Sequence, residues 1–213
     1  MEFFITLPEH DDTTAYLSAW AGELIELAKQ KGLAVFEFRR ERASAAEVGK
    51  FLGRKNPKLA MFNGHGGEDW VAGHRNEVLI KSGQNERLLK DKVIYCRSCS
   101  SAAKLGRDCV QSGAAAFIGY CDLFGFPINP QKSATPLRDE FAKPCLDVSN
   151  QAVKSLLKGN TAGEAYVSSQ AAAERWIEKL QQSDAPPEAP HLLLWLLWNK
   201  AHQKIHGNKS VRL

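Results

Sequence analysis

The first 122 residues alternate between short apolar runs and longer segments in which apolar residues recur every three or four positions. The short runs predict β-strands at residues 3–7, 33–38, 58–63, 92–97 and 114–120. The longer segments predict helices at residues 16–27, 43–52 and 98–112, and residues 77–89 indicate a small strand or hairpin. Strands that alternate with helices indicate βαβ units, and strands without a polar face suit a covered sheet. The pattern therefore predicts an α/β fold with a mostly parallel sheet and helices on both faces.

The pattern changes after Tyr120, where a loop at residues 123–135 leads into a helical C-terminal region. Helices are expected at about residues 137–141, 147–157, 161–182 and 191–206. The apolar turn at residues 192–198 is expected to pack against the sheet, with a contact to a partner or a second copy as the alternative. The basic end, residues 204–213, is expected to be solvated and frayed. We expect one domain, residues 1–213, with a sheet core at 1–122 and a loop and helical part at 123–213.

Composition places the chain among ordinary globular proteins, since 44% of its 213 residues are apolar and 24% are charged. The net charge of +4 is too small to favour direct binding of nucleic acid. The longest apolar run falls far short of the roughly 20 residues that cross a bilayer, so no membrane association is expected. Five cysteines, an odd number in the middle of the chain, do not form the framework of a secreted scaffold. We therefore expect a cytoplasmic protein with free thiols.

Two strand ends carry reactive side chains. His65 follows the third expected strand within a glycine-rich turn, and Cys99 follows the fourth, 34 positions later. In a parallel sheet, ligands bind where the carboxyl ends of the strands meet, so the two side chains are expected to face each other. A helix that starts at Cys99 would favour its thiolate, and an imidazole would take or hold the proton. The backbone amides of Gly66 and Cys99 would donate to an oxyanion.

At these two places the sequence resembles the caspase-like cysteine peptidases of clan CD, which include caspases, metacaspases, gingipains, clostripain, separase and the bacterial CHAT-type proteases. The matching segments are KLAMFNGHGG for the histidine motif and KVIYCRSCSSAAKLG for the cysteine motif. The strand in QSGAAAFIGY is similar to the segment that leads into the specificity loop of these proteins. The CHAT-type branch looks closest, and the resemblance covers roughly residues 58–122.

The resemblance implies a caspase-like fold and a cysteine endopeptidase. It assigns the general acid and base to His65, the nucleophile to Cys99 and an oxyanion donor to Gly66, with cleavage through a thioester acyl-enzyme. No metal and no organic cofactor are expected, and the substrate would be a protein or peptide. CHAT-type domains are usually attached to repeat or sensor domains, which this sequence lacks, so regulation by a partner protein is expected unless the enzyme is always active.

Acidic residues near the two motifs are candidates for substrate binding. In relatives that cleave after Arg or Lys, an acidic side chain lies in the pocket for the residue before the scissile bond. Asp122, after the last strand, could pair with such a basic side chain. An ordinary turn aspartate is the alternative. Asp69 and Glu68, just after the histidine turn, are further candidates.

Other interpretations of the same residues stay open. Cys96 and Cys99 form a C-x-x-C pair, the arrangement of a thioredoxin-like redox site, although Cys96 lies within an apolar strand and suits the core. A zinc site of cysteines lacks a second close pair. Residues 119–122 partly match the nucleophile elbow of α/β-hydrolases, but its last glycine is replaced by Leu123. A caspase-like interaction module with an idle dyad is the non-enzymatic alternative.

Overall fold

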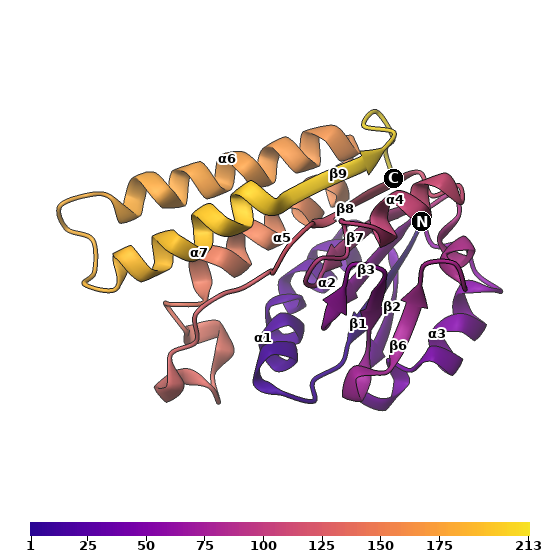
Figure 1. Ribbon diagram of the computed structural model, residues 1–213, viewed down its shortest axis with the longest axis horizontal. Helices are drawn as coiled ribbons and strands as arrows, with labels where there is room; N and C mark the ends of the chain where they lie inside the picture. Colours follow the sequence, from indigo (N-terminus) through magenta and orange to yellow (C-terminus); the bar gives the residue numbers. More distant parts are fainter.

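Six strands form the central sheet of the computed structural model, which describes all 213 residues (Figure 1). Along the chain they are β1 (Glu2–Leu7), β2 (Ala34–Arg39), β3 (Leu59–Asn63), β7 (Val93–Arg97), β8 (Ala116–Tyr120) and β9 (Gln203–Gly207). Their order across the sheet is β2-β1-β3-β7-β8-β9. The first five run parallel, and β9 is antiparallel to β8. The five strands expected from the sequence are all present, and the mostly parallel sheet is confirmed.

A small antiparallel sheet follows β3 directly. It consists of β4 (Gly66–Gly67), β5 (Trp70–Ala72) and β6 (Val78–Lys81). The sequence indicated only β6. Strands of two and three residues are too short to show an alternation of apolar and polar positions, so β4 and β5 left no pattern to detect.

Seven helices accompany the strands (Figure 1). They are α1 (Asp12–Trp20), α2 (Gly22–Gln30), α3 (Ala45–Leu52), α4 (Leu105–Gln111), α5 (Lys143–Leu157), α6 (Ala162–Leu180) and α7 (Ala189–His202). The single helix expected at residues 16–27 is divided into α1 and α2 at Ala21. The helix expected at 137–141 is only a 3-10 turn, Pro136–Arg138, and α5 begins earlier than expected.

Helices cover both faces of the sheet, as the unbroken apolar strands predict. Successive side chains of a strand point to opposite faces. Ile5 and Met61 pack on the side of α2 and α5, whereas Phe4 and Phe62 pack on the side of α3, α4 and the small sheet. Each face therefore has its own buried core.

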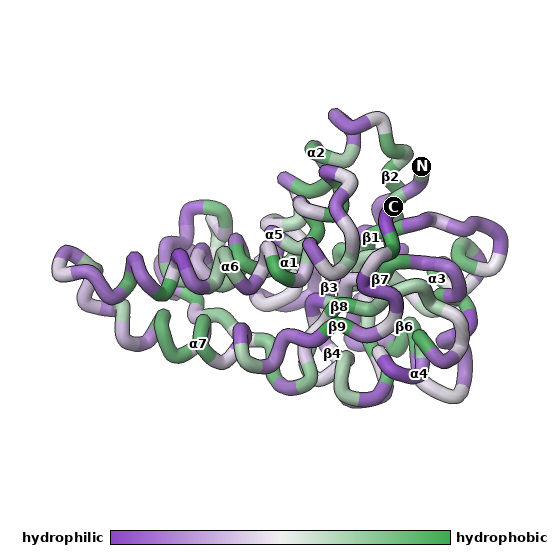
Figure 2. Tube along the Cα trace, turned by 90° about the horizontal axis from the view of Figure 1, so that it is seen from above, coloured by the Kyte–Doolittle hydropathy of each residue, from purple (hydrophilic) through white to green (hydrophobic).

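Helices α6 and α7 form a hairpin that extends away from the sheet (Figures 1 and 2). Hydrophobic and hydrophilic residues alternate along both helices (Figure 2). Leu192 and Leu196 of α7 lie in a separate cluster with residues of α5 and α6. The expectation that this apolar helix packs against the sheet is therefore wrong, because α5 and α6 supply an apolar surface of their own. The opposite side of α7 leaves Leu194, Leu197 and Trp198 exposed.

The C-terminal end is ordered and adds an edge strand to the sheet. The helix expected at 191–206 stops at His202 because the next five residues pair with β8 as β9. Beyond β9, the carbonyls of Lys209 and Val211 accept hydrogen bonds of 2.8 and 2.9 Å from the amides at the start of α6. The expectation of a frayed basic end is wrong, since these bonds and the pairing with β8 hold it in place.

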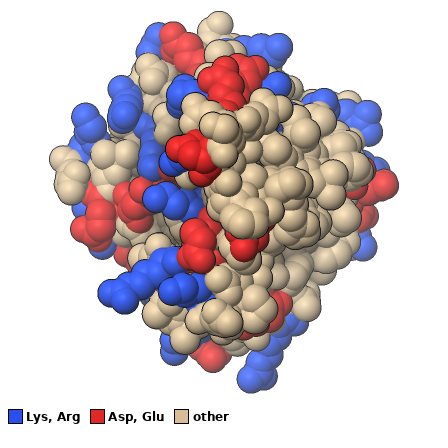
Figure 3. Space-filling view, turned by 90° about the vertical axis from the view of Figure 1, so that its left-hand side faces the viewer, with Lys and Arg blue, Asp and Glu red and all other residues tan.

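The surface carries charges of both signs. Figure 3 shows one face on which basic side chains are interspersed with acidic ones beside a broad uncharged area. This face therefore presents no continuous basic surface. None of the helices combines the length and the apolar character needed to cross a membrane.

Candidate active site

The carboxyl ends of β3 and β7 lie side by side in the sheet. Asn63 at the end of β3 pairs with Arg97 at the end of β7. His65 and Cys99 each follow two residues later. Because the two strands are parallel and in register, the loops that carry the imidazole and the thiol leave the sheet at the same edge.

Two glycines let the histidine loop lie directly against its neighbours. Gly64 has a φ of 148°, and a Cβ there would overlap the carbonyl oxygen of Ala72. A Cβ at Gly66 would lie 2.9 Å from the carbonyl oxygen of Cys99 and from the side chain of Ser98. A larger residue at position 66 would push the histidine loop and the cysteine loop apart.

The cysteine loop is fastened to the end of β8. The amide of Ser100 donates to the carbonyl of Asp122 at 2.9 Å, and the amide of Ala102 donates to the carbonyl of Tyr120 at 2.8 Å. Ser100 has a φ of 56°, in the left-handed region that non-glycine residues seldom occupy. Such strain persists where the surrounding structure holds it, which is common at functional sites.

The thiol of Cys99 is half-buried, and its surroundings favour the protonated form. Its Sγ donates to the carbonyl of Phe124 at 3.7 Å, and no hydrogen bond joins it to His65. Burial, and after it the negative charge of Asp122, raises the pKa of the Cys99 thiol. The expectation of a thiolate at a helix N-terminus is wrong, because residues 98–104 form turns and α4 starts only at Leu105.

The imidazole of His65 is held by a carboxylate that no sequence motif marks. His65 Nε2 lies 2.7 Å from Oδ2 of Asp11. Partial burial raises the pKa of Asp11, but hydrogen bonds from Thr14 and His65 outweigh it and lower the pKa overall. An ionised carboxylate only accepts hydrogen bonds, so Nε2 carries the proton. The other ring nitrogen, Nδ1, is then the one that is free to accept a proton.

Asp11 is itself fixed in place by helix α1. It is the N-cap residue of that helix, and its Oδ1 accepts hydrogen bonds from the amide and the hydroxyl of Thr14 at 2.7 and 2.8 Å. One carboxylate oxygen therefore serves the helix and the other serves His65. This division holds the imidazole in one orientation.

Two backbone amides near the thiol remain available to a ligand. The amide of Cys99 donates to no backbone carbonyl and to no side chain of another residue. Gly66 lies opposite Val71 in the small antiparallel sheet. The neighbouring pair, His65 and Ala72, is a hydrogen-bonded pair, because the amide of Ala72 donates to the carbonyl of His65. Gly66 and Val71 are therefore a pair without ladder hydrogen bonds. In an antiparallel pair, the amide at such a position points away from the partner strand.

The three acidic candidates for substrate binding lie at different places relative to Cys99. Asp122 lies close enough to Cys99 for its charge to act on the thiol. Its side chain is 46% exposed and its Oδ2 lies 3.9 Å from Nε2 of His202. Asp69 lies in the turn between β4 and β5, on the side of Lys104. Glu68 is exposed, and its carbonyl accepts hydrogen bonds from Lys104 and Leu105.

The ends of β1 and β3 bring together a third set of polar side chains. His10, Asp11 and His65 offer one ligand atom each, and these atoms all lie within 4.8 Å of one another. The sequence signal for this set is the HDD segment after the first strand. It becomes meaningful only once β1 is known to neighbour β3, an order that the sequence pattern did not supply.

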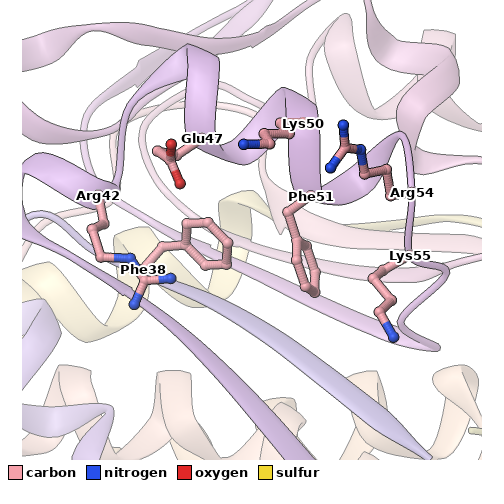
Figure 4. A pocket seen from close by; sticks show the side chains of 7 residues that line it. All are labelled: Phe38, Arg42, Glu47, Lys50, Phe51, Arg54 and Lys55. Carbon is pink, nitrogen blue, oxygen red and sulfur yellow. The ribbon is translucent and has the colours of Figure 1, made fainter.

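A surface pocket lies away from these strand ends, between β2 and α3 (Figure 4). Its volume is about 260 Å³. It is lined by two phenylalanines and several charged side chains, among them Phe38, Phe51, Arg42, Lys50, Arg54 and Lys55. Figure 4 shows the two aromatic rings standing between the basic side chains. No nucleophile lines this pocket, so it is not a second candidate for peptide chemistry.

Three of the remaining cysteines, Cys96, Cys109 and Cys145, are buried, whereas Cys121 is half-buried. Cys96 is buried in the core beside Phe62, as its apolar strand predicted, and burial raises its pKa well above the usual range. A redox pair needs an activated thiolate, so this environment argues against a C-x-x-C site. The part of the chain after Cys121 adds only the antiparallel β9 to the sheet. It lacks the further parallel strands that an α/β-hydrolase would need.

No protein-family model matches the sequence, and no curated protein matches it. Among solved structures, the chain is similar to the Arg-specific cysteine proteinase gingipain R, with a TM-score of 0.61 and 13% identity. It is also similar to the complex of Porphyromonas gingivalis RgpB pro- and mature domains, with a TM-score of 0.61 and 11% identity. The matches cover 100% of this chain but 47% and 48% of those chains. The chain thus spans about half the length of the structures that it matches.

This likeness concerns the fold. The α/β architecture with a largely parallel sheet matches that of the gingipain structures, so the expected caspase-like fold is confirmed. The closer resemblance to the CHAT-type branch stays a prediction.

Proposed function

We propose that this protein is a cysteine endopeptidase in which Cys99 is the nucleophile and His65 the general acid and base. One observation carries the proposal. The in-register pairing of β3 and β7 brings both loops to one sheet edge, where Gly66 lies against the backbone of Cys99. The shared fold with cysteine proteinases supports the same assignment.

The proton positions set the order of steps. The thiol starts protonated, so His65 Nδ1 takes its proton as the sulfur attacks the peptide carbonyl carbon. The negative charge on the carbonyl oxygen is received by the free amides of Gly66 and Cys99. The tetrahedral intermediate collapses as the imidazolium protonates the leaving amine, which leaves a thioester. A water molecule, deprotonated by Nδ1, then hydrolyses the thioester and restores the thiol.

Asp11 acts as a positioning residue in this scheme. Its carboxylate holds the proton on Nε2 and stabilises the imidazolium that forms when Nδ1 is protonated. Because α1 fixes the carboxylate, the ring is oriented before the substrate arrives.

We assign substrate recognition to Asp122, with Asp69 as the more distant candidate. Gingipain R is named as Arg specific. Asp122 places an exposed carboxylate next to Cys99, where a basic side chain before the scissile bond would meet it. A matched pair of substrates with Arg or the uncharged citrulline at that position tests this. Asp122→Asn should reduce the preference for Arg, whereas an unchanged preference would exclude Asp122 from the pocket.

Cleavage of a general peptide library tests the central assignment. Wild type should cleave peptides and Cys99→Ala should not. Cys121→Ala is the matched control, because Cys121 is also half-buried and lies just beyond β8. Retained cleavage by Cys99→Ala would refute the assignment.

The idle interaction module is a second candidate, favoured by the hydrogen bond from the thiol to Phe124 rather than to His65. In that case the wild-type protein would cleave no peptide, and a thiol-directed acylating reagent would not label Cys99. The expectation of a regulatory partner stays a prediction.

A further inference from the structure

The imidazoles of His10 and His65 both lie near one carboxylate oxygen of Asp11. Oδ2 of Asp11 lies 2.7 Å from Nε2 of His65 and 3.5 Å from Nε2 of His10. The proposed peptide chemistry uses His65 and Asp11 but gives His10 nothing to do. His10 Nε2 also lies 3.1 Å from Oδ1 of Asn76, so the position of this imidazole between two oxygen atoms requires its own explanation.

The imidazole of His10 is held in place by its surroundings. Its side chain is 10% exposed. Its Nδ1 lies 3.5 Å from the hydroxyl of Thr14, and its ring packs edge-on to those of His65 and His74 at centroid distances of 5.9 and 5.5 Å. A bound metal would replace the contact of His10 Nε2 with Oδ1 of Asn76, which is 3.1 Å long. The Thr14 hydroxyl would then orient the ring through Nδ1, as a polar partner does for histidines that bind metals.

Two imidazole nitrogens and one carboxylate oxygen are donors that suit zinc. Zinc binds these atoms at about 2.0–2.2 Å, which separates the donors of a tetrahedral site by about 3.3–3.6 Å. The gap of 3.5 Å between Asp11 and His10 fits this spacing, and the gap of 2.7 Å to His65 would open by less than about 1 Å. Three protein ligands leave a fourth position for water.

We propose that His10 Nε2, Asp11 Oδ2 and His65 Nε2 form a binding site for Zn²⁺, and that the bound ion switches off the peptidase. Zinc takes the place of the proton on His65 Nε2, and that proton moves through solvent to Nδ1, so the ring stays neutral. Nδ1 then carries a proton and has no lone pair to accept the proton of the Cys99 thiol. The binding site follows from the geometry alone, whereas the inhibition rests on the proposed function.

Binding is measured first on a protein that cannot use its thiol. Untagged Cys99→Ala is titrated with ZnCl₂ in a calorimeter and with CoCl₂ in a spectrophotometer. One ion per chain should bind, and Co²⁺ should show the absorption of a four-coordinate site without a thiolate band. Absence of binding to Cys99→Ala would overturn the proposal, because His10, Asp11 and His65 would then not be sufficient to bind the ion.

The ligand assignment is tested by replacing His10 in the same background. His10→Phe keeps an aromatic ring but removes the nitrogen, so the Kd for Zn²⁺ should rise at least about tenfold. The matched control is His191→Phe, the same change at an exposed histidine at the start of α7. Equal affinities of the two variants would overturn the site.

Inhibition is then measured with the thiol present. The Zn²⁺ concentration that halves peptide cleavage should rise with His10→Phe by the same factor as the Kd. If Zn²⁺ binds but wild type cleaves no peptide with or without a chelator, the metal site stands and the proposed function fails. If wild type cleaves peptides but the cysteine-free protein binds no Zn²⁺, the metal site fails and the proposed function stands.

Discussion

At the scale of single residues, Asp11 has two roles, since it caps α1 and holds the imidazole of His65. One substitution can distinguish these roles. Asparagine caps helices about as well as aspartate, so Asp11→Asn keeps the cap of α1 and removes the charge that faces His65. We expect kcat for peptide cleavage to fall at least about tenfold, with little change in KM. The free energy of unfolding should change by less than about 0.5 kcal/mol, as urea denaturation would show.

Asp12→Asn is the control, because it removes the same charge from the next residue, which is exposed in the first turn of α1. It should leave kcat close to the wild-type value. Equal losses in both variants would mean that net charge, and not the contact with His65, matters.

The thiol of Cys99 should react as a buried thiol. Burial and the charge of Asp122 raise its pKa, so its alkylation by iodoacetamide should reach half-maximal rate at a higher pH than that of an ordinary cysteine. Asp122→Asn removes one negative charge and should move this midpoint to lower pH. Asp69→Asn should not move it. Mass spectrometry of the peptide that contains Cys99 measures the rates, and a midpoint below that of an ordinary cysteine would contradict the structure.

The residues predicted from the sequence were those with a local signature. His65 follows a strand within glycines and Cys99 follows a strand within small residues, so each carries its own motif. Asp11 and His10 have no such motif, since HDD after a strand is an ordinary turn. Their role depends on β1 lying next to β3, which is a property of the sheet order and not of the local sequence.

At the scale of elements, one buried side chain links β7 to the helices that cover it. Arg97 is fully buried, and burial lowers its pKa to about 10. Its guanidinium donates to Oδ1 of Asn63 at 2.9 Å, to Oδ1 of Asn150 at 2.7 Å and to the carbonyl of Leu17 at 2.5 Å. These partners belong to β3, α5 and α1. The side chain thus joins elements that directly support the candidate active site.

Arg97→Met should therefore destabilise the fold. Methionine fills a similar space but leaves the buried Oδ1 atoms of Asn63 and Asn150 without a donor, and we expect a loss of about 3 kcal/mol or more in the free energy of unfolding. Arg107→Met, on the exposed side of α4, should cost less than about 0.5 kcal/mol. Urea denaturation of both variants provides the comparison, and equal midpoints would contradict the assigned role of Arg97.

Strands were predictable at this scale and helix starts were not. Five apolar runs marked five strands because a strand covered on both faces has no polar side. The start of α4 was missed because residues 98–104 have helix-compatible composition, while the tight binding of Ser100 and Ala102 to β8 imposes turns instead. Tertiary hydrogen bonds overrode local preference there.

At the scale of the whole molecule, both ends of the chain contribute a strand to the central sheet. β9 covers the edge of β8 that the preceding helices leave open, and Ile205, Val211 and Leu213 pack against the central core. The sequence suggested a frayed end because residues 204–213 form a basic tail, and it suggested a helix up to residue 206. The pairing that makes β9 a strand spans more than 80 residues of chain, and no local pattern encodes it.

The closing strand should contribute to overall stability through the side chain of Ile205, which packs against the central core. Ile205→Glu places a charge against the core and should lower the free energy of unfolding by about 2 kcal/mol. Lys204→Glu introduces the same residue on the exposed side of the strand and should change it by less than about 0.5 kcal/mol. Thermal and urea unfolding of the two proteins measure this difference, and similar losses would mean that β9 does not pack as the structure has it.

The most direct test of the central claim is covalent trapping of the nucleophile. Wild-type protein is incubated with a peptidyl acyloxymethyl ketone that carries Arg at the position next to the reactive group, and the modified residue is mapped by mass spectrometry. A cysteine endopeptidase built on His65 and Cys99 should take up one label per chain on Cys99, and His65→Ala should take up far less. No label, or a label on Cys121 instead, would contradict it.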